Sequence, residues 1–242
     1  IEAAASTVLT LAVGLPVAWA MRRYRWKRIR LQRTLLYLPF VTPPVVAAVG
    51  FLAMFSEGGW VHSIGLDVRS NTSNITNPGA WFTEGLHLGQ FSALIIAHAW
   101  FNMSLVIRFC EPILATLDPS MEEQLRLLPA GRTISGRIRH LWLPVLIPPL
   151  SASFCMSFVF SFTSFALVRW ITIRDNTLES VMAISSPSAG IDGYMAFTSE
   201  IVLASSLIQF AVLSVSLWLA SRIQRELQRP VSYTHLTLPT KA

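Results

Sequence analysis

The chain has 242 residues, of which 52% are apolar and only 13% are charged, and its net charge is +6. Soluble domains carry about 25% charged residues, so this composition excludes an ordinary soluble fold and indicates a membrane protein. The positive charge does not favour nucleic-acid binding, because the basic residues gather in short segments beside apolar runs, as in the cytoplasmic loops of membrane proteins.

Five segments are long and apolar enough to be transmembrane helices, each of which needs about 20 residues. Taken in chain order, we predict spans at residues 3–20, 34–55, 91–107, 141–168 and 195–220. Prolines at positions 39, 43 and 44 predict a kinked or broken second span, since membrane helices tolerate proline when neighbouring helices satisfy the freed carbonyls. In the fourth span, Pro144, Pro148 and Pro149 predict a proline-rich start at the cytoplasmic face.

The loops between these segments all agree with one topology. Arginine-rich residues 22–33, 108–140 and 222–229 are predicted to be cytoplasmic, whereas residues 56–89 and 169–194, with few basic residues, are predicted to lie outside. A first span that begins at the outer face implies a sixth helix upstream. The tail of residues 231–242 is similar to translated sequencing-adapter read-through and is left out of the fold; a short natural tail is the alternative.

Residues 121–146 form an arginine-rich polar segment between two apolar spans. Its polar helix can present residues 122–128 on a surface, and Gly131 permits the sharp turn that a helix C-terminus needs. Arg132, Arg137 and Arg139 can pair with acidic groups of a partner protein or with lipid phosphates. The segment returns to the membrane at Leu143 and Pro144.

Polar residues inside the spans are candidates for a translocation path. Four serines recur at helical spacing along one face of the fourth span: Ser153, Ser157, Ser161 and Ser164. They favour close helix packing and can also line a hydrated path. Glu200 is an acid in the fifth span, and intramembrane acids are candidate functional sites. His98 and Asn102 share one helix face and predict hydrogen bonds between helices.

Motifs of common enzymes are absent from the sequence, which has no GxSxG, HExxH or Walker A loop. No metal-ligand or cysteine-pair spacing is present either, so Cys110 and Cys155 are predicted to be buried thiols. The chain is therefore expected to be neither an enzyme nor a holder of a cofactor or metal.

Four stretches resemble the inner-membrane permease subunits of binding-protein-dependent ABC importers: residues 8–23, 35–55, 98–124 and 131–150. This resemblance implies an all-α polytopic protein with the type I importer fold, in which residues 1–230 form one permease domain with about five of six helices. Three shorter motifs are most similar to one half of the fused two-repeat permeases for thiamine or ferric iron, namely GGW at residues 58–60, HAWFN at 98–102 and TLES at 177–180.

The family's cytoplasmic loop is a helix-turn-helix that docks on the ATPase, with an EAA pattern, a glycine and a distant Leu-Pro. Gly131 and Leu143-Pro144 match that spacing, whereas the places of EAA are taken by Leu125, Arg126 and Leu127. The resemblance implies that an ATPase-coupling loop is formed by Glu122, Glu123, Arg126, Gly131, Arg132, Leu143 and Pro144.

The implied partners are ABC ATPase subunits that carry ATP-Mg, an extracytoplasmic binding protein, a second permease half and the bilayer of a bacterial inner membrane. The implied function is import of a thiamine- or ferric-iron-type solute by alternating access. The alternatives are a permease for spermidine, sulfate or another small solute, a fragment of an ion-coupled secondary transporter, and a membrane anchor or scaffold.

Overall fold

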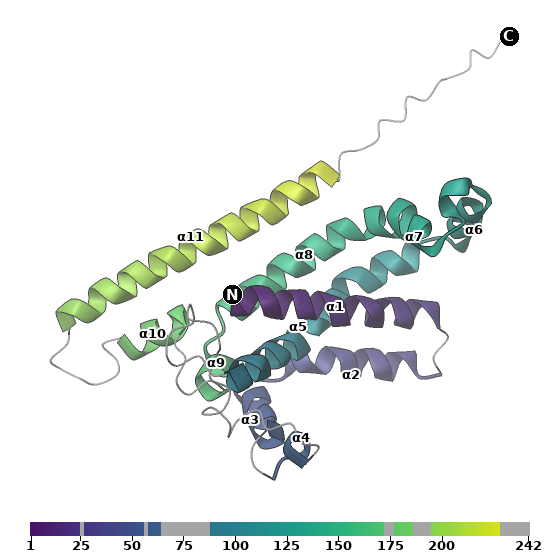
Figure 1. Cartoon of the computed structure of the whole chain (residues 1–242). Coiled ribbons are helices and arrows are strands. Elements are labelled where there is room, and N and C mark those ends of the chain that lie inside the picture. Colours follow the sequence, from purple (N-terminus) through teal and green to yellow (C-terminus); the bar gives the residue numbers. More distant parts are fainter. Residues whose placement is uncertain (25–26, 56–57, 64–87, 172–176, 186–194, 228–242) are drawn as a thin grey trace.

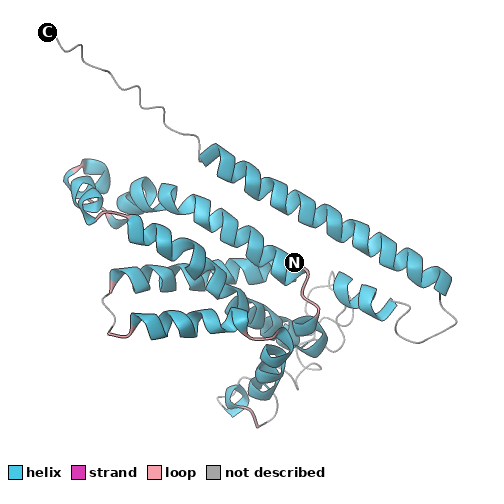
Figure 2. Ribbon diagram, turned by 180° about the vertical axis from the view of Figure 1, so that it is seen from behind, coloured by secondary structure: helices cyan, strands magenta, loops and turns pink. Residues whose placement is uncertain are grey.

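The computed structural model describes residues 1–24, 27–55, 58–63, 88–171, 177–185 and 195–227, and this part of the chain is helical without strands (Figures 1 and 2). Its helices are α1 (Glu2–Arg23), α2 (Ile29–Val41), α3 (Pro44–Phe55), α4 (Trp60–Ser63), α5 (Leu88–Thr116), α6 (Pro119–Leu127), α7 (Ile134–Arg137), α8 (Leu143–Phe162), α9 (Ala166–Ile171), α10 (Leu178–Ser185) and α11 (Met195–Leu227). The predicted outer segments lie mostly outside the described residues, and the tail of residues 231–242 lies wholly outside them.

Helices α1, α2, α5 and α8 form the bundle (Figure 1). The most extensive contact joins α1 to α5, where α1 presents a buried stripe of small residues at helical spacing: Ala3, Ser6, Thr7, Thr10, Gly14 and Ala18. A Cβ atom on Gly14 would lie 2.7 Å from Cβ of Val106. Small residues allow this close approach of helices, and the hydroxyls of Thr7 and Thr10 donate to carbonyls of their own helix.

The second predicted span is broken, as its prolines indicate. Helices α2 and α3 meet at an angle of 99°. Thr42, between them, has an extended backbone with φ −66° and ψ 131°, because the residue before a proline is displaced from the helical region. Pro43 follows it, and α3 begins at Pro44.

Two predicted spans have different limits in the structure. Helix α5 runs to Thr116, nine residues beyond the predicted end at residue 107, because the segment after Arg108 packs in the bundle through Cys110, Glu111 and Leu114. The fourth span does not continue to residue 168: α8 ends at Phe162, and the short helix α9 follows after three residues.

The fourth span also begins earlier than predicted. The chain is helical from Ile134, through α7 and a π-helical turn at Ile138–Trp142, into α8. Leu143 and Pro144 therefore lie within this helix and do not end the loop. The N–H of Leu143 donates to the carbonyl of Ile138, five residues back. Helices α5 and α7 thus extend into the predicted cytoplasmic segment 108–140 from either side.

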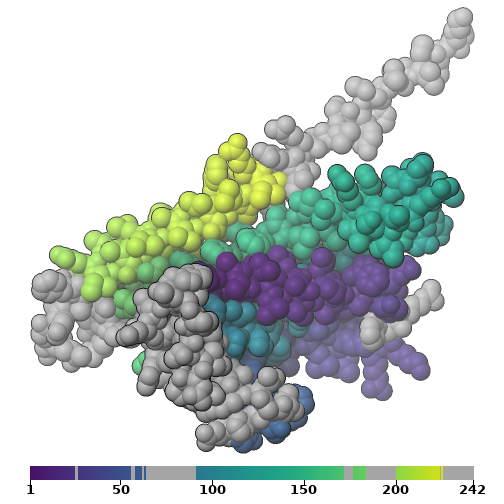
Figure 3. Space-filling view, in the orientation of Figure 1, coloured from purple at the N-terminus to yellow at the C-terminus, as the bar shows by residue number. Residues whose placement is uncertain are grey.

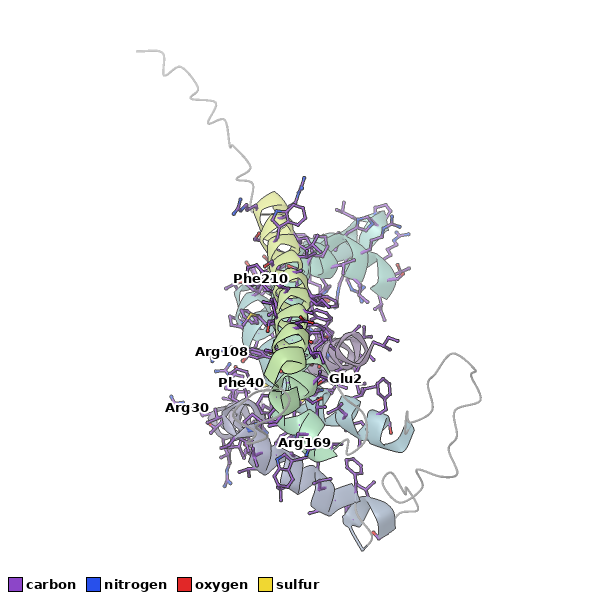
Figure 4. The ribbon with its side chains drawn as sticks, turned by 90° about the vertical axis from the view of Figure 1, so that its left-hand side faces the viewer. Glu2, Arg30, Phe40, Arg108, Arg169 and Phe210 are labelled. Carbon is purple, nitrogen blue, oxygen red and sulfur yellow. The ribbon has the colours of Figure 1, made fainter. Side chains whose placement is uncertain are left out.

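The arrangement of the ends agrees with the predicted topology. The carboxyl end of α1, the amino end of α2, the α6–α7 segment and the carboxyl end of α11 lie toward one end of the bundle, while α3, α4, α9 and α10 lie toward the other (Figure 1). Helix α11 packs beside α8 and α10, and Phe210 on it is 71% exposed (Figure 4). The described part contains four helices that can cross a membrane, or up to five if α2 and α3 count as one span.

Candidate functional site

The cytoplasmic loop begins with a capped helix. Asp118 precedes α6, and its carboxylate accepts a hydrogen bond from the backbone N–H of Ser120 at 2.9 Å. Pro119 occupies the first turn, where a missing N–H costs nothing. The same hydrogen bond lowers the pKa of Asp118 from its usual 3.8, because it favours the charged carboxylate.

Glu122 joins the two helical parts of the loop. Its Oε1 lies 2.8 Å from Nη2 of Arg126 on the next turn of α6, and 3.6 Å from Nε of Arg137 on α7. Its side chain is 19% exposed. The predicted contact residue Glu122 is thus engaged inside the loop, where it fixes α6 relative to α7.

Gly131 is buried where the chain turns between α6 and α7. A Cβ atom there would lie 1.9 Å from the carbonyl oxygen of Leu125, far inside contact distance. The only positive φ among the described residues belongs to Gly58. Close backbone packing therefore requires glycine at position 131, whereas the left-handed conformation that often calls for glycine is not used there.

Helix α7 starts at a capped residue. Thr133 is extended, and its Oγ1 accepts a hydrogen bond from the N–H of Gly136 at 3.1 Å. Arg137 closes the turn, since its Nη1 donates to the carbonyl of Gly131 at 3.2 Å. The loop is therefore a rigid helix-turn-helix with its own network of polar contacts.

The outer surface of the loop carries side chains of two kinds. Glu123, Arg126 and Arg132 are exposed, as predicted for contact residues. Three apolar residues of α6 and its end are exposed: Met121 at 48%, Leu127 at 84% and Leu128 at 56%. Leu127 and Leu128 belong to residues 122–128, which the sequence predicts to lie on a surface, while Met121 was missed.

The serines of α8 face the inside of the bundle. Ser153, Ser157 and Ser161 are at most 2% exposed. Asn102 on α5 donates to Oγ of Ser161 at 3.0 Å and to the carbonyl of Ser157 at 3.4 Å. The expected hydrogen bonds between helices are therefore present, and these serines pack α8 against α5.

Ser164 and Glu200 lie apart from that stripe. Ser164 follows the end of α8 and is half-buried, while Glu200 is exposed near the start of α11. Ser164 lines a pocket of about 180 Å³ together with His98, Phe101, Asn102, Phe160, Thr163 and Phe165. Of the four serines, Ser164 therefore lines this pocket and the other three do not.

Three buried polar atoms near this pocket have no hydrogen-bond partner: His98 Nε2, Asn102 Oδ1 and Ser157 Oγ. His98 is 1% and Asn102 0% exposed, and both line the pocket. Buried polar groups are normally satisfied by protein or water. This region of the bundle is therefore suited to water or to a hydrogen-bonding solute.

Two further polar contacts join neighbouring helices, of which the one at His98 was expected, whereas the ion pair of Arg33 with Glu111 was missed by sequence reasoning. His98 Nδ1 lies 2.6 Å from Oε1 of Glu2 on α1, and the guanidinium of Arg33 on α2 contacts the carboxylate of Glu111 on α5. The available signal was an acid within an apolar run, because such an acid needs a partner on a neighbouring helix.

The chain matches a known family over most of its length. The family of binding-protein-dependent transport system inner membrane components matches residues 11–229. The sulfate transport system permease protein CysT of Salmonella typhimurium is 26% identical over 211 residues, which cover 82% of this chain and 67% of that protein. The maltose/maltodextrin transport system permease protein MalF of Photorhabdus laumondii is 27% identical over 202 residues, which cover 83% of this chain but only 36% of that protein.

A solved structure has the same fold. It is a bacterial ABC transporter involved in the import of the acidic polysaccharide alginate, with a TM-score of 0.60 and 15% identity over 94% of this chain and 78% of the other. At this identity the likeness concerns the fold alone. It confirms the predicted all-α importer fold, and the family match confirms the multi-pass inner-membrane location.

Proposed function

The chain belongs to the family of inner membrane components of binding-protein-dependent transport systems, and on that premise we propose that it forms the translocation path of an ATP-driven importer for a small solute. A binding protein delivers the solute from outside, a second permease half completes the path, and separate ATPase subunits hydrolyse ATP-Mg. This chain carries no nucleotide motif of its own. Family membership argues against the rival ion-coupled transporter and the rival anchor or scaffold.

The observation that carries the proposal is the rigid loop between α5 and α8. It leaves the bundle at residues 117–133, and its two helices are tied together through Glu122, Arg137 and the carbonyl of Gly131. A loop held in this way can transmit a movement of the ATPase to α5 and α8, because a displacement of α6 also displaces α7 and the helices that the loop joins. The exposed Leu127 and Leu128 supply an apolar docking surface.

The pocket beside α5 and α8 supports a polar section of the path. His98, Asn102, Thr163 and Ser164 offer hydrogen-bonding groups, and the rest of the lining is apolar, with three phenylalanines, Pro44, Ala166 and Leu167. In an alternating-access cycle, the solute passes this pocket when the halves separate. Ser157 and Ser161 guide the path indirectly through their hydrogen bonds with Asn102 of α5, and Ser153 and the exposed Glu200 are candidates for other parts of the path.

Two groups of substrate are candidates. The motifs GGW, HAWFN and TLES support thiamine or ferric iron as the substrate. The two relatives described above are named as permeases for sulfate and for maltose or maltodextrin, and they give no support to thiamine or iron. Sulfate therefore stands as the second candidate, together with other small solutes.

Uptake into proteoliposomes tests the proposal. The protein is reconstituted with its genomic neighbours, an ATPase and a binding protein, and uptake of labelled thiamine, ferric iron, sulfate and maltose is measured with and without ATP. ATP-dependent uptake of one solute, lost on deletion of residues 122–131, is expected. Uptake driven by an ion gradient without ATP would contradict the proposal.

A further inference from the structure

A groove of about 620 Å³ lies between the cytoplasmic end of α1 and the segment that runs from α6 into α8. Figure 3 shows these two parts of the chain side by side. Each wall is a stripe of residues four positions apart, with Leu15, Trp19 and Arg23 on α1 and Leu146, Trp142 and Ile138 on the facing segment. The walls run antiparallel, so residues at equal depth in the bundle face each other. The groove is thus a continuous channel along both helices.

The chemistry of the walls changes with depth. Leu15 and Leu146 lie deepest, and the two tryptophans follow at the next turn. The cationic residues Arg23, Arg126 and Arg137 line the cytoplasmic end. Eight residues of α1, from Leu15 to Arg23, correspond to a rise of about 12 Å. One leaflet of a bilayer has the same order from its centre to the cytoplasm: acyl chains, then the interface where aromatic side chains gather, then phosphates.

The charge at the cytoplasmic end is positive. Three arginines line it with one carboxylate, that of Glu122, which gives a local charge of +2. Glu122 already contacts Arg126 and Arg137, and Arg23 at the end of α1 is exposed. An anionic group is therefore favoured at this end, next to aromatic and apolar surface.

We propose that this groove binds an anionic phospholipid. One acyl chain lies between Leu15 and Leu146, the glycerol region contacts Trp19 and Trp142, and the phosphate lies between Arg23 and Arg126. Because Arg126 and Arg137 belong to the α6–α7 loop, the bound lipid holds that loop against α1. This site does not depend on the solute or on ATPase docking.

Native mass spectrometry of the purified protein tests the site directly. Phosphatidylglycerol and phosphatidylcholine with identical acyl chains are added in detergent, and retained lipid is counted. Retention of phosphatidylglycerol is expected to exceed that of phosphatidylcholine, and the double variant R23Q/R126Q is expected to lower it about tenfold, since each basic residue contributes a severalfold effect. The control is the double variant K27Q/R30Q, whose two residues are exposed at the same end of the bundle but do not line the groove. It is expected to change the retention of phosphatidylglycerol less than twofold.

A filling variant separates the groove from general attraction by charge. Ile138 is 50% exposed and lines the groove, so Ile138→Trp narrows the groove next to Trp142 while every arginine stays. Loss of phosphatidylglycerol from this variant is expected. Equal retention of both lipids, an equal effect of the two charge pairs, or full retention by Ile138→Trp would overturn the proposal. Dimers without lipid that dissociate on Ile138→Trp would show that a second copy fills the groove instead.

Discussion

The guanidinium of Arg137 donates to the carbonyl oxygen of Gly131 across 3.2 Å, and this contact closes the turn between α6 and α7. The same arginine lies 3.6 Å from Glu122 on α6. One side chain on α7 thus holds both the turn and the preceding helix. These contacts tie α6, the turn and α7 together, as the proposed coupling role requires.

Substitution of Gly131 by alanine is expected to distort this loop. The new methyl group would collide with the carbonyl oxygen of Leu125, and overpacking of this kind costs about 1–3 kcal/mol. We expect ATP-dependent uptake in proteoliposomes to fall at least tenfold while the protein still inserts. Gly50→Ala is the matched control, because a Cβ atom at Gly50 meets nothing within 4 Å; an equal loss in both variants would contradict the role of Gly131.

Removal of the Arg33 side chain is expected to destabilise the bundle between α2 and α5. In Arg33→Ala, the carboxylate of Glu111, whose side chain is 7% exposed, loses its cationic partner. Because Arg33 itself is 46% exposed, the cost is expected to be about 1–2 kcal/mol, less than for a fully buried pair. Thermal unfolding in detergent measures it.

Two further variants separate the ion pair from other effects of the substitution. The double variant R33L/E111L removes both charges and is expected to recover most of the lost stability, since no charge is then left buried without a partner. Arg30→Ala removes an exposed charge on the same helix and is expected to have little effect. If the double variant were less stable than Arg33→Ala, the account of this pair would be wrong.

A larger residue at Gly14 is expected to separate α1 from α5. Val106 lies directly opposite, so that even a Cβ atom would be 2.7 Å from Cβ of Val106. Gly14→Leu is expected to lower the unfolding temperature in detergent by a free-energy cost of about 1–3 kcal/mol, whereas Gly50→Leu, in open space, is expected to be tolerated. Equal unfolding temperatures of Gly14→Leu and the unmodified protein would show that α1 does not pack here.

The start of α6 is expected to loosen in acid. The pKa of Asp118 is lowered from 3.8 in the folded chain by the hydrogen bond from Ser120. The capping contribution is therefore complete above about pH 3.8 and is lost as the pH falls through the folded pKa. Hydrogen exchange of α6, corrected for the intrinsic exchange rate, is expected to rise over that range. Asp118→Asn should abolish this pH dependence; an unchanged acid response in that variant would contradict the assignment.

The general architecture could be predicted from the sequence because hydropathy and arginine distribution determine which segments cross the membrane and on which side they end. The break at Thr42 could also be predicted, because a proline interrupts a helix through its effect on the neighbouring backbone, which the sequence alone reveals. The end of α5 could not be predicted, because Arg108 and Glu111 are charged, as loop residues often are. The pairing of Glu111 with Arg33 on another helix appears only in the structure. The sequence shows that such an acid needs a partner, but it does not identify the distant residue that supplies one.

The α6–α7 loop likewise combines features that the sequence predicts with features that depend on contacts formed in the fold. Gly131 was identified from its spacing, while the engagement of Glu122 by Arg126 and Arg137 depends on the turn between the helices. Leu127 and Leu128 lie within residues 122–128, which the sequence predicts to be presented on a surface. The structure leaves both of them at the surface.

Affinity of the purified protein for its ATPase tests the central claim most directly. The double variant L127D/L128D places two charges on the exposed docking surface, and Leu31→Asp places one on an exposed position of α2 outside the loop. Co-purification of the ATPase is expected to be lost with L127D/L128D and retained with Leu31→Asp. Undiminished ATPase binding by L127D/L128D would contradict the assignment of the α6–α7 loop as the coupling element.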